Sequence, residues 1–143
     1  LVAFIPMLMG TGGNSGAQSS TAVIRSLSLG ETETGDALIV MWRELRVAFL
    51  CGIALAAVNF VKMLLLDGML LNNDAVTVAV AATVSLSIVG IVLFAKVVGS
   101  MLPLLAEKLG LDPAVMANPL ISTVTDAVSL LIYIFIAKLI LNI

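Results

Sequence analysis

The 143-residue sequence contains no histidine and only one cysteine, Cys51. Without histidine, the chain lacks the most common transition-metal ligand and the most common general base. A single cysteine excludes a disulfide within the chain and argues against a thiolate metal site. The sequence also lacks a P-loop, a dinucleotide-binding motif, the motifs of zinc proteases and serine hydrolases, and a basic stripe for nucleic acid. We therefore predict that the chain is not an enzyme and binds no nucleic acid.

Charged residues are scarce as well, at 11% of the chain, whereas hydrophobic residues make up 61% and the mean hydropathy is +1.20. A soluble domain of this length hides only about 70% of its surface on folding and cannot bury so much apolar surface. The length instead suits about four membrane spans of ~20 residues with short connections. We predict an all-α, polytopic membrane helical bundle that forms one domain over residues 1–143, with spans at about 1–29, 47–71, 75–108 and 119–143.

Polar segments and helix-stop signals separate these predicted spans. A first loop is expected over residues 26–46, which carry acidic and basic residues together, and a short polar turn over 72–74. Gly110 is typical of the residue that follows a helix end, and Asp112-Pro113 can begin a short helical turn. Asn118-Pro119 repeats that signal, so the last span is predicted to begin there.

The distribution of Lys and Arg predicts the orientation, because these residues gather on the cytoplasmic side of membrane proteins. Five of them fall on the side of the first loop, against Lys62 and Lys138 on the other, so we place that loop in the cytoplasm. The five are Arg25, Arg43, Arg46, Lys96 and Lys108. The chain opens on Leu1 in an apolar run, without an initiator Met or a basic segment, so we expect a fragment that lacks an upstream span and any soluble domains.

Asp126 is the only carboxylate between residues 121 and 137, in an otherwise apolar stretch. Ser122, Ser129 and Tyr133 have offsets that place them on the same helix face as this acid. An Asp at mid-membrane costs roughly 2.5–3.5 kcal/mol, and no Lys, Arg or His lies within two helical turns of it. Its partner is therefore on another span or is a mobile cation. The alternative is a protonated, structural acid that is hydrogen-bonded to Ser or Thr of a neighbouring span.

A glycine-rich segment, residues 10–16, interrupts the first predicted span. Each helical glycine costs about 1 kcal/mol relative to Ala, so we predict a break in the helix with loosened backbone carbonyls. Asn14, Gln18 and Arg25 are expected on one face of this span. Gly12 and Gly16 also have the spacing of close helix packing, and the sequence leaves packing and pore lining equally open.

The two segments together offer only oxygen donors to an ion. Oxygen ligands suit hard cations such as Mg²⁺, Ca²⁺ or Na⁺ and disfavour soft metals. One carboxylate per chain is too little for a dehydrated divalent ion, but Mg²⁺ commonly keeps several waters. A symmetric dimer would bring two Asp126 side chains to one axis, so we predict a hydrated divalent ion between two protomers. The candidate donors are Asp126, the hydroxyls of Ser122, Thr125 and Ser129, the amides of Asn14 and Gln18, and the carbonyls of Gly12, Gly13 and Gly16.

Five stretches of the chain resemble the membrane domain of the MgtE family of magnesium channels. They are residues 4–21, 25–31, 42–46, 102–113 and 118–126, and together they extend over nearly the whole chain. The most specific motifs are Gly12-Gly-Asn-Ser-Gly-Ala-Gln18 and Asn118-Pro-Leu-Ile-Ser-Thr-Val-Thr-Asp126. Gly10 departs from the pattern, because many family members carry Asp at this position.

The resemblance implies a homodimer in the prokaryotic plasma membrane, with five spans per protomer, cytoplasmic regulatory domains that sense Mg²⁺, and a pore on the dimer axis. The second and fifth spans of such proteins line the pore and correspond here to residues 1–29 and 119–143. The resemblance also places a hydrated Mg²⁺ on Asp126, with a backbone carbonyl at Ser122. The further contributors that it implies in the glycine-rich segment are Gly13, Asn14, Gly16 and Gln18.

We therefore predict a Mg²⁺-selective channel or transporter that moves hydrated divalent cations and is driven by the membrane potential. A doubly charged ion gains about 4.6 kcal/mol across about 100 mV, so an inside-negative potential suffices for uptake. The alternative is a proton- or Na⁺-coupled secondary carrier that uses Asp126 as its coupling site. A third interpretation is a structural membrane subunit whose small-residue faces bind partner helices.

Overall fold

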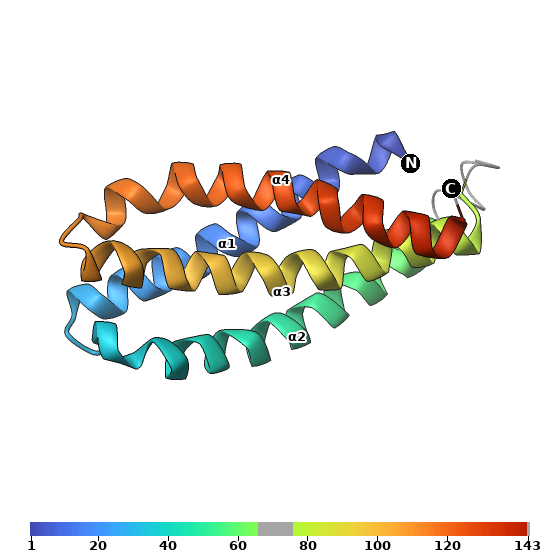
Figure 1. Ribbon diagram of the computed structural model, residues 1–143. Coiled ribbons are helices and arrows are strands. Elements are labelled where there is room, and N and C mark those ends of the chain that lie inside the picture. Colours follow the sequence, from blue (N-terminus) through green and yellow to red (C-terminus); the bar gives the residue numbers. More distant parts are fainter. Residues whose placement is uncertain (66–75, 143) are drawn as a thin grey trace.

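The computed structural model describes residues 1–65 and 76–142, the side chains of residues 116–118 excepted. This part of the chain is built from long helices that lie side by side (Figure 1) and contains no strand, which confirms the predicted all-α fold. The long helices are α1 (Ile5–Ser28), α2 (Ala37–Lys62), α3 (Val78–Lys108) and α4 (Pro113–Leu141). Two short 3-10 helices, η1 (Val2–Phe4) and η2 (Thr34–Asp36), precede α1 and α2.

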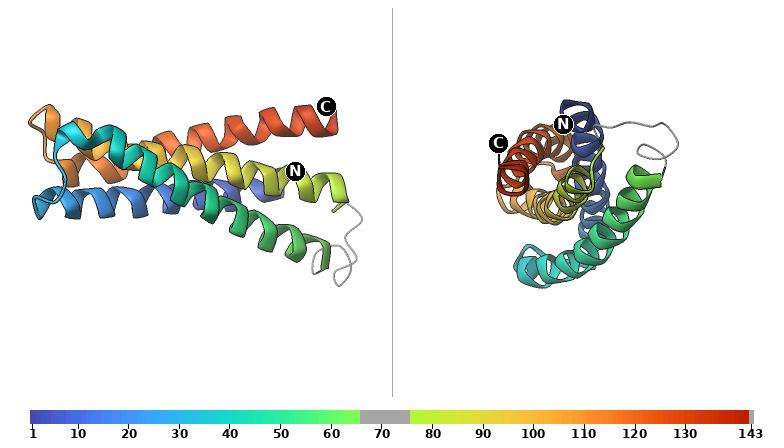
Figure 2. Two further views of the ribbon diagram at one scale, coloured as in Figure 1. Left: turned by 90° about the horizontal axis from the view of Figure 1, so that it is seen from below. Right: turned by 90° about the vertical axis from the view of Figure 1, so that its right-hand side faces the viewer.

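Helix α3 lies at the centre of the bundle and packs against α1, α2 and α4 (Figures 1 and 2). Half of its apolar stretch is buried, compared with 17% in α2 and 22% in α4. Many of its buried residues are small, among them Ala81, Ser87, Ala95 and Gly99. Small side chains let helix backbones approach closely where no water drives the association, so the composition of α3 accounts for its central place.

Three helices of the described residues are long and apolar enough to cross a membrane, within Thr34–Leu65, Val78–Lys108 and Pro119–Leu141. Large apolar side chains such as Leu50 on α2 and Phe135 on α4 are 70% and 65% exposed. Apolar surface of this extent is unusual on a soluble monomer and is expected where a protein faces lipid. Helix α1 is long enough to cross as well, but its glycine, hydroxyl and amide residues make it more polar than the other three.

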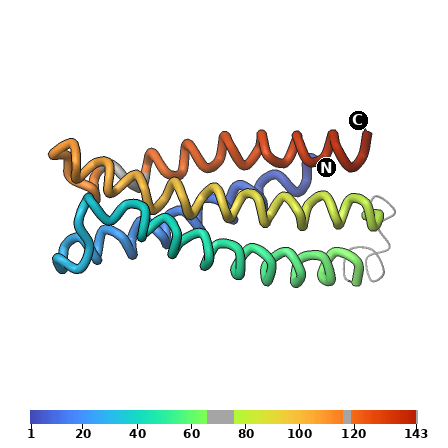
Figure 3. Tube along the Cα trace, turned by 60° about the horizontal axis from the view of Figure 1, so that its bottom comes forward, coloured from blue at the N-terminus to red at the C-terminus, as the bar shows by residue number. Residues whose placement is uncertain are grey.

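The connections α1–α2 and α3–α4 lie at one end of the bundle, and both termini lie toward the other (Figures 1 and 3). This arrangement agrees with the predicted grouping of Arg25, Arg43, Arg46 and Lys108, which all lie near the end with the two connections. Which compartment that end faces stays a prediction. The turn predicted over residues 72–74, between α2 and α3, lies outside the described residues.

Helix α2 begins at Ala37, so the prediction of a loop over residues 26–46 is wrong in its second half. A capping box at η2 stabilises the turn that leads into α2. In this capping box the Glu33 backbone N–H donates to the Asp36 carboxylate at 2.9 Å. Several of the residues that follow have good intrinsic helix propensity, the charged Arg43, Glu44 and Arg46 among them. A cluster of charges therefore marked the first turns of a helix rather than a loop.

The last helix begins at Pro113, earlier than the predicted start at Asn118-Pro119. The Asp112 carboxylate accepts a hydrogen bond from the Ala114 backbone N–H at 2.8 Å, and Pro113 suits the first helical position. Gly110, with a φ of 71°, follows the end of α3 as predicted. Pro119 lies inside α4, so the signal at Asn118-Pro119 does not mark the start of a helix.

Helix α1 passes through the glycine-rich segment without a break, contrary to the prediction. Gly12 and Gly16 are buried, and a Cβ at these positions would lie 2.5 Å from the Ser129 Oγ and 2.7 Å from a methyl carbon of Ile121. Close packing against neighbouring helices therefore offsets the low intrinsic propensity of glycine. The carbonyls of residues 10–16 lie within a helix and not in a loosened loop.

Candidate cation site

Asp126 of α4 lies against the backbone of α1 at Gly13. A Cβ placed on Gly13 would be 3.8 Å from the Asp126 Oδ1, an ordinary contact distance. Gly12 faces Ser129 and Gly16 faces Thr125, so α1 and α4 run antiparallel past each other with Asp126 near the middle of the contact. The structure therefore brings together two of the predicted site residues, one from each helix.

Asp126 and Gly13 are half-buried, whereas Asn14, Gln18 and Ser122 are exposed. Asn14 and Gln18 are four residues apart and lie on one face of α1, as predicted. That face is an exposed edge of the bundle, and Asn14 directly follows Gly13, the residue of α1 beside which the half-buried Asp126 carboxylate lies. Several oxygen donors are thus available to a ligand that approaches from outside this protomer.

Within the described residues, the Asp126 carboxylate makes no ion pair or hydrogen bond. The nearby hydroxyl of Thr125 is turned into its own helix, where it donates to the carbonyls of Ile121 at 2.6 Å and Ser122 at 3.1 Å. Neither a basic side chain nor a Ser or Thr of a neighbouring helix in this part of the chain stabilises the acid. The alternative of a structural, hydrogen-bonded Asp126 therefore finds no support among these contacts.

Gly16 is separated from the other candidate donors. It is buried, and a Cβ there would lie 2.7 Å from Ile121 and 3.2 Å from the carbonyl oxygen of Ala95. Its own carbonyl oxygen faces Gly99 of α3, where even a methyl group would overlap it. Gly16 thus serves the packing of α1 against α3 and α4, which is one of the two roles that the sequence left open for the glycines.

Of the polar stripe expected along α4, only Ser122 and Asp126 are accessible from outside the bundle, Ser122 being exposed and Asp126 half-buried. Ser129 is 1% exposed and faces Gly12 of α1, and Tyr133 is buried and donates to the carbonyl of Leu1 at 3.0 Å. The four residues share one helix face, but α1 covers that face beyond Asp126. Ser129 and Tyr133 therefore hold helices together rather than line the open edge.

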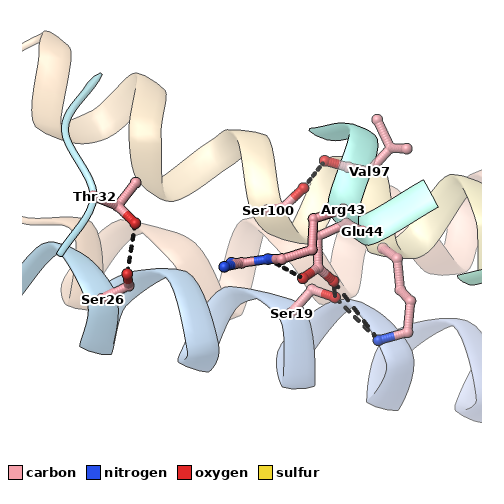
Figure 4. A network of polar contacts seen from close by, with 8 residues as sticks. Ser19, Ser26, Thr32, Arg43, Glu44, Val97 and Ser100 are labelled. Atoms are coloured by element: carbon pink, nitrogen blue, oxygen red, sulfur yellow. Dashed lines mark hydrogen bonds and ion pairs between the residues drawn. The ribbon is translucent and has the colours of Figure 1, made fainter. Parts of the chain in front are cut away.

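A buried polar cluster of Ser19, Glu44 and Lys96 connects α1, α2 and α3. The Ser19 hydroxyl donates to Glu44 Oε2 at 2.7 Å and accepts from Lys96 Nζ at 3.2 Å, and Lys96 Nζ lies 3.9 Å from Glu44 Oε2. Figure 4 shows Ser19 and Glu44 turned toward each other, with Arg43 beside them. The Lys96 and Glu44 side chains are each only 8% exposed.

The sequence pattern does not predict this cluster, and the prediction that Lys96 belongs to the charges near a loop is wrong, because its side chain is buried beside Glu44. The correction follows from burial, because a buried ammonium group requires a charged or polar partner. A signal was present in the sequence, since Lys96 is the only charged residue between residues 75 and 106. It did not identify Glu44 as the partner, because the two residues lie on different helices.

These features define a class of protein. A bundle of helices long and apolar enough to cross a membrane, one of which carries a half-buried carboxylate, defines a polytopic membrane protein in which that acid marks a functional site by default. Comparison with known proteins specifies the class further.

The chain belongs to the MgtE family, whose sequence model is described as a divalent cation transporter and matches residues 5–136. It is 40% identical over 142 residues to the magnesium transporter MgtE of Thermus thermophilus, in an alignment that covers 99% of this chain and 30% of that protein. It is 32% identical over 137 residues to the magnesium transporter MgtE of Bacillus subtilis, with 96% of this chain and 29% of that protein covered.

The chain thus spans less than a third of the length of these relatives. Family membership confirms the resemblance seen in the motifs, and it agrees with the prediction of a transport protein rather than an enzyme. Together with its apolar helices, it identifies the chain as part of a membrane protein.

Proposed function

We propose that this chain is the ion-conducting domain of a Mg²⁺ transport protein, and that hydrated ions pass through a pore on the axis of a homodimer. The observation that carries the proposal is Asp126, a half-buried carboxylate without a partner among the described residues. An unpaired charge at membrane depth is costly, and a cation relieves that cost. The relatives named as magnesium transporters support Mg²⁺ as the cation.

The donor set suits an ion that keeps its water shell. Mg²⁺ gives up water reluctantly and is commonly held through one or two carboxylates. Asp126 would attract the ion and bind its waters, while Ser122, Asn14 and Gln18 supply further oxygen atoms along the same edge. Gly13 leaves space beside the carboxylate, because a side chain there would contact the Asp126 Oδ1.

The two positive charges of the ion support the proposed homodimer. One protomer supplies a single carboxylate at this site, whereas the ion carries two positive charges. The site is open toward the outside of the protomer, where a second copy can supply a second Asp126 across a twofold axis. Two unpaired carboxylates on the axis would cost about 5–7 kcal/mol without the ion, so the cation and the dimer stabilise each other.

The proposal of a channel can be separated from that of a coupled carrier by the driving force. The carrier alternative depended partly on a broken helix, and α1 is continuous from Ile5 to Ser28. We expect vesicles with the reconstituted, intact protein to take up Mg²⁺ when a K⁺ diffusion potential makes their interior negative, since ~100 mV supplies about 4.6 kcal/mol for a 2+ ion. A fluorescent Mg²⁺ indicator inside the vesicles reports the uptake.

The control abolishes the proton and Na⁺ gradients with ionophores at a constant voltage. Continued uptake supports a channel. Uptake that stops when either gradient is removed contradicts the channel mechanism and supports the coupled carrier.

The space beside Asp126 provides a second test, with Gly13→Ala. The added methyl group would be in ordinary contact with the carboxylate, so we expect the bundle to fold and Mg²⁺ uptake to fall because the ion's water shell loses room. Gly10→Ala is the matched control, since nothing lies within 4 Å of a Cβ there. Both changes raise helix propensity by about 1 kcal/mol, so equal uptake by the two variants would contradict the role of Gly13.

A further inference from the structure

We propose that Ser19, Glu44 and Lys96 form a positioning cluster that sets the rotation of α1 and thereby directs Gln18 toward the cation path. The inference rests on the proposed function, because it assumes that the exposed face of α1 lines that path. Each of the three residues comes from a different helix, so the cluster is a fixed point between α1, α2 and α3.

Stability alone does not account for this cluster. Replacing a buried ion pair with apolar side chains of similar volume is often neutral or stabilising, and the best-attested use of such pairs is to specify one arrangement. Here the two charges are 3.9 Å apart, at the limit of an ion pair, and the Ser19 hydroxyl bridges them at shorter distances of 2.7 and 3.2 Å. Ser19 is therefore hydrogen-bonded to both charged groups, the Glu44 carboxylate and the Lys96 ammonium group.

The position of Ser19 on α1 makes this contact directional. Successive helical residues point about 100° apart, so holding Ser19 inward holds its neighbour Gln18 toward the outside, where it is exposed. The other buried residues of α1 make only packing contacts with the neighbouring helices, and Gly12 and Gly16 among them have no side chains. Within the described residues, Ser19 is the buried residue of α1 that adds hydrogen bonds to other helices, which are directional.

Arg43 is the second cation near this cluster, with its Nε 3.8 Å from Glu44 Oε1. Its side chain is 50% exposed, whereas that of Lys96 is 8% exposed. Water screens Arg43 and weakens its pairing, so Lys96 is the partner that fixes Glu44 and, through Ser19, the α1 helix.

The decisive experiment compares Ser19→Ala with Ser20→Ala in the intact protein. The two serines are adjacent and buried, but the Ser20 hydroxyl has no hydrogen-bond partner within the described residues. Each variant is combined with Gln18→Cys and Cys51→Ala, and the rate at which a water-soluble thiol reagent modifies residue 18 is measured. We expect Ser19→Ala to change this rate by about tenfold, the equivalent of a lost hydrogen bond to a charged group, and Ser20→Ala to leave it unchanged.

Mg²⁺ uptake is then measured for Ser19→Ala and Ser20→Ala with Gln18 intact, and only the former is expected to change the concentration for half-maximal uptake. A lower amount of folded protein would reduce the maximal rate and leave this concentration unaltered. Equal thiol rates and equal half-maximal concentrations for the two variants overturn the inference. If no variant and not even the wild type takes up Mg²⁺, the proposed function fails, while the thiol rates still test the cluster.

An apolar replacement of the charges separates positioning from stability. The double variant Glu44→Leu with Lys96→Met is expected to remain folded on size-exclusion chromatography, because no unpaired charge is left buried. Positioning predicts that residue 18 of this folded protein reacts at an altered rate. An unaltered rate would show that the cluster has only a structural role.

Discussion

Asp126→Ala is expected to abolish Mg²⁺ uptake while the bundle remains folded. The carboxylate has no partner among the described residues that its removal would leave unsatisfied. Loss of the charge also removes an insertion cost of roughly 2.5–3.5 kcal/mol, so we expect the thermal stability of the purified protein to be unchanged or higher. Indicator-loaded vesicles measure uptake, and size-exclusion chromatography after heating measures stability.

Asp126→Asn distinguishes charge from shape, because the amide has nearly the same volume and no negative charge. We expect it to lose uptake as Asp126→Ala does. Glu107→Gln is the matched control, since it removes one negative charge from an exposed position at the end of α3. Normal uptake by Asp126→Asn, or an equal loss in Glu107→Gln, would be incompatible with Asp126 as the residue that attracts the ion.

Gly99→Ala is expected to destabilise the bundle strongly. The added Cβ would overlap the carbonyl oxygen, carbonyl carbon and Cα of Gly16, and backbone atoms cannot rotate away as a side chain can. Overpacking of this kind typically costs about 1–3 kcal/mol, which exceeds the gain of about 1 kcal/mol in helix propensity. We expect a lower melting temperature and less folded protein, because α1 and α3 are forced apart.

Gly10→Ala again serves as the control, because its Cβ has open space and its helix propensity rises in the same way. It should melt at the same temperature as the wild type or slightly higher. Equal stability of Gly99→Ala and Gly10→Ala would mean that the close crossing of α1 and α3 at Gly16 and Gly99 does not support the fold.

Local features of the chain could be predicted because their causes are local. The scarcity of charge indicates a membrane bundle, and helix boundaries at Gly110 and Asp112 depend on backbone conformation and capping within a few residues. The same local reasoning failed for residues 10–16, where glycine propensity predicts a break. Contacts with Ile121, Ser129 and α3 decide the outcome there, and those residues are far away in the sequence.

In the candidate site as well, one residue could be predicted from the sequence and another could not. Asp126 was identified from the sequence because an isolated acid in an apolar run is unusual wherever it points, and the motif that surrounds it resembles a known family. Its neighbour Gly13 was identified only as part of a group of glycines. The sequence could not distinguish Gly13 from Gly16, since one turn of helix decides which of them meets the acid and which is packed against α3.

By itself, the sequence determined that this protein is a helical membrane bundle and that it belongs to a family of divalent cation transporters. It also determined that Asp126 is an isolated acid in an apolar stretch. Composition and short motifs carry this information because hydrophobic burial and helix capping act within a span. Only the tertiary structure decided that α1 stays helical through its glycines and that Lys96 and Glu44 meet at Ser19. These outcomes depend on contacts between helices, such as that of Lys96 with a serine 77 residues away, and no local pattern encodes which side chains will face each other.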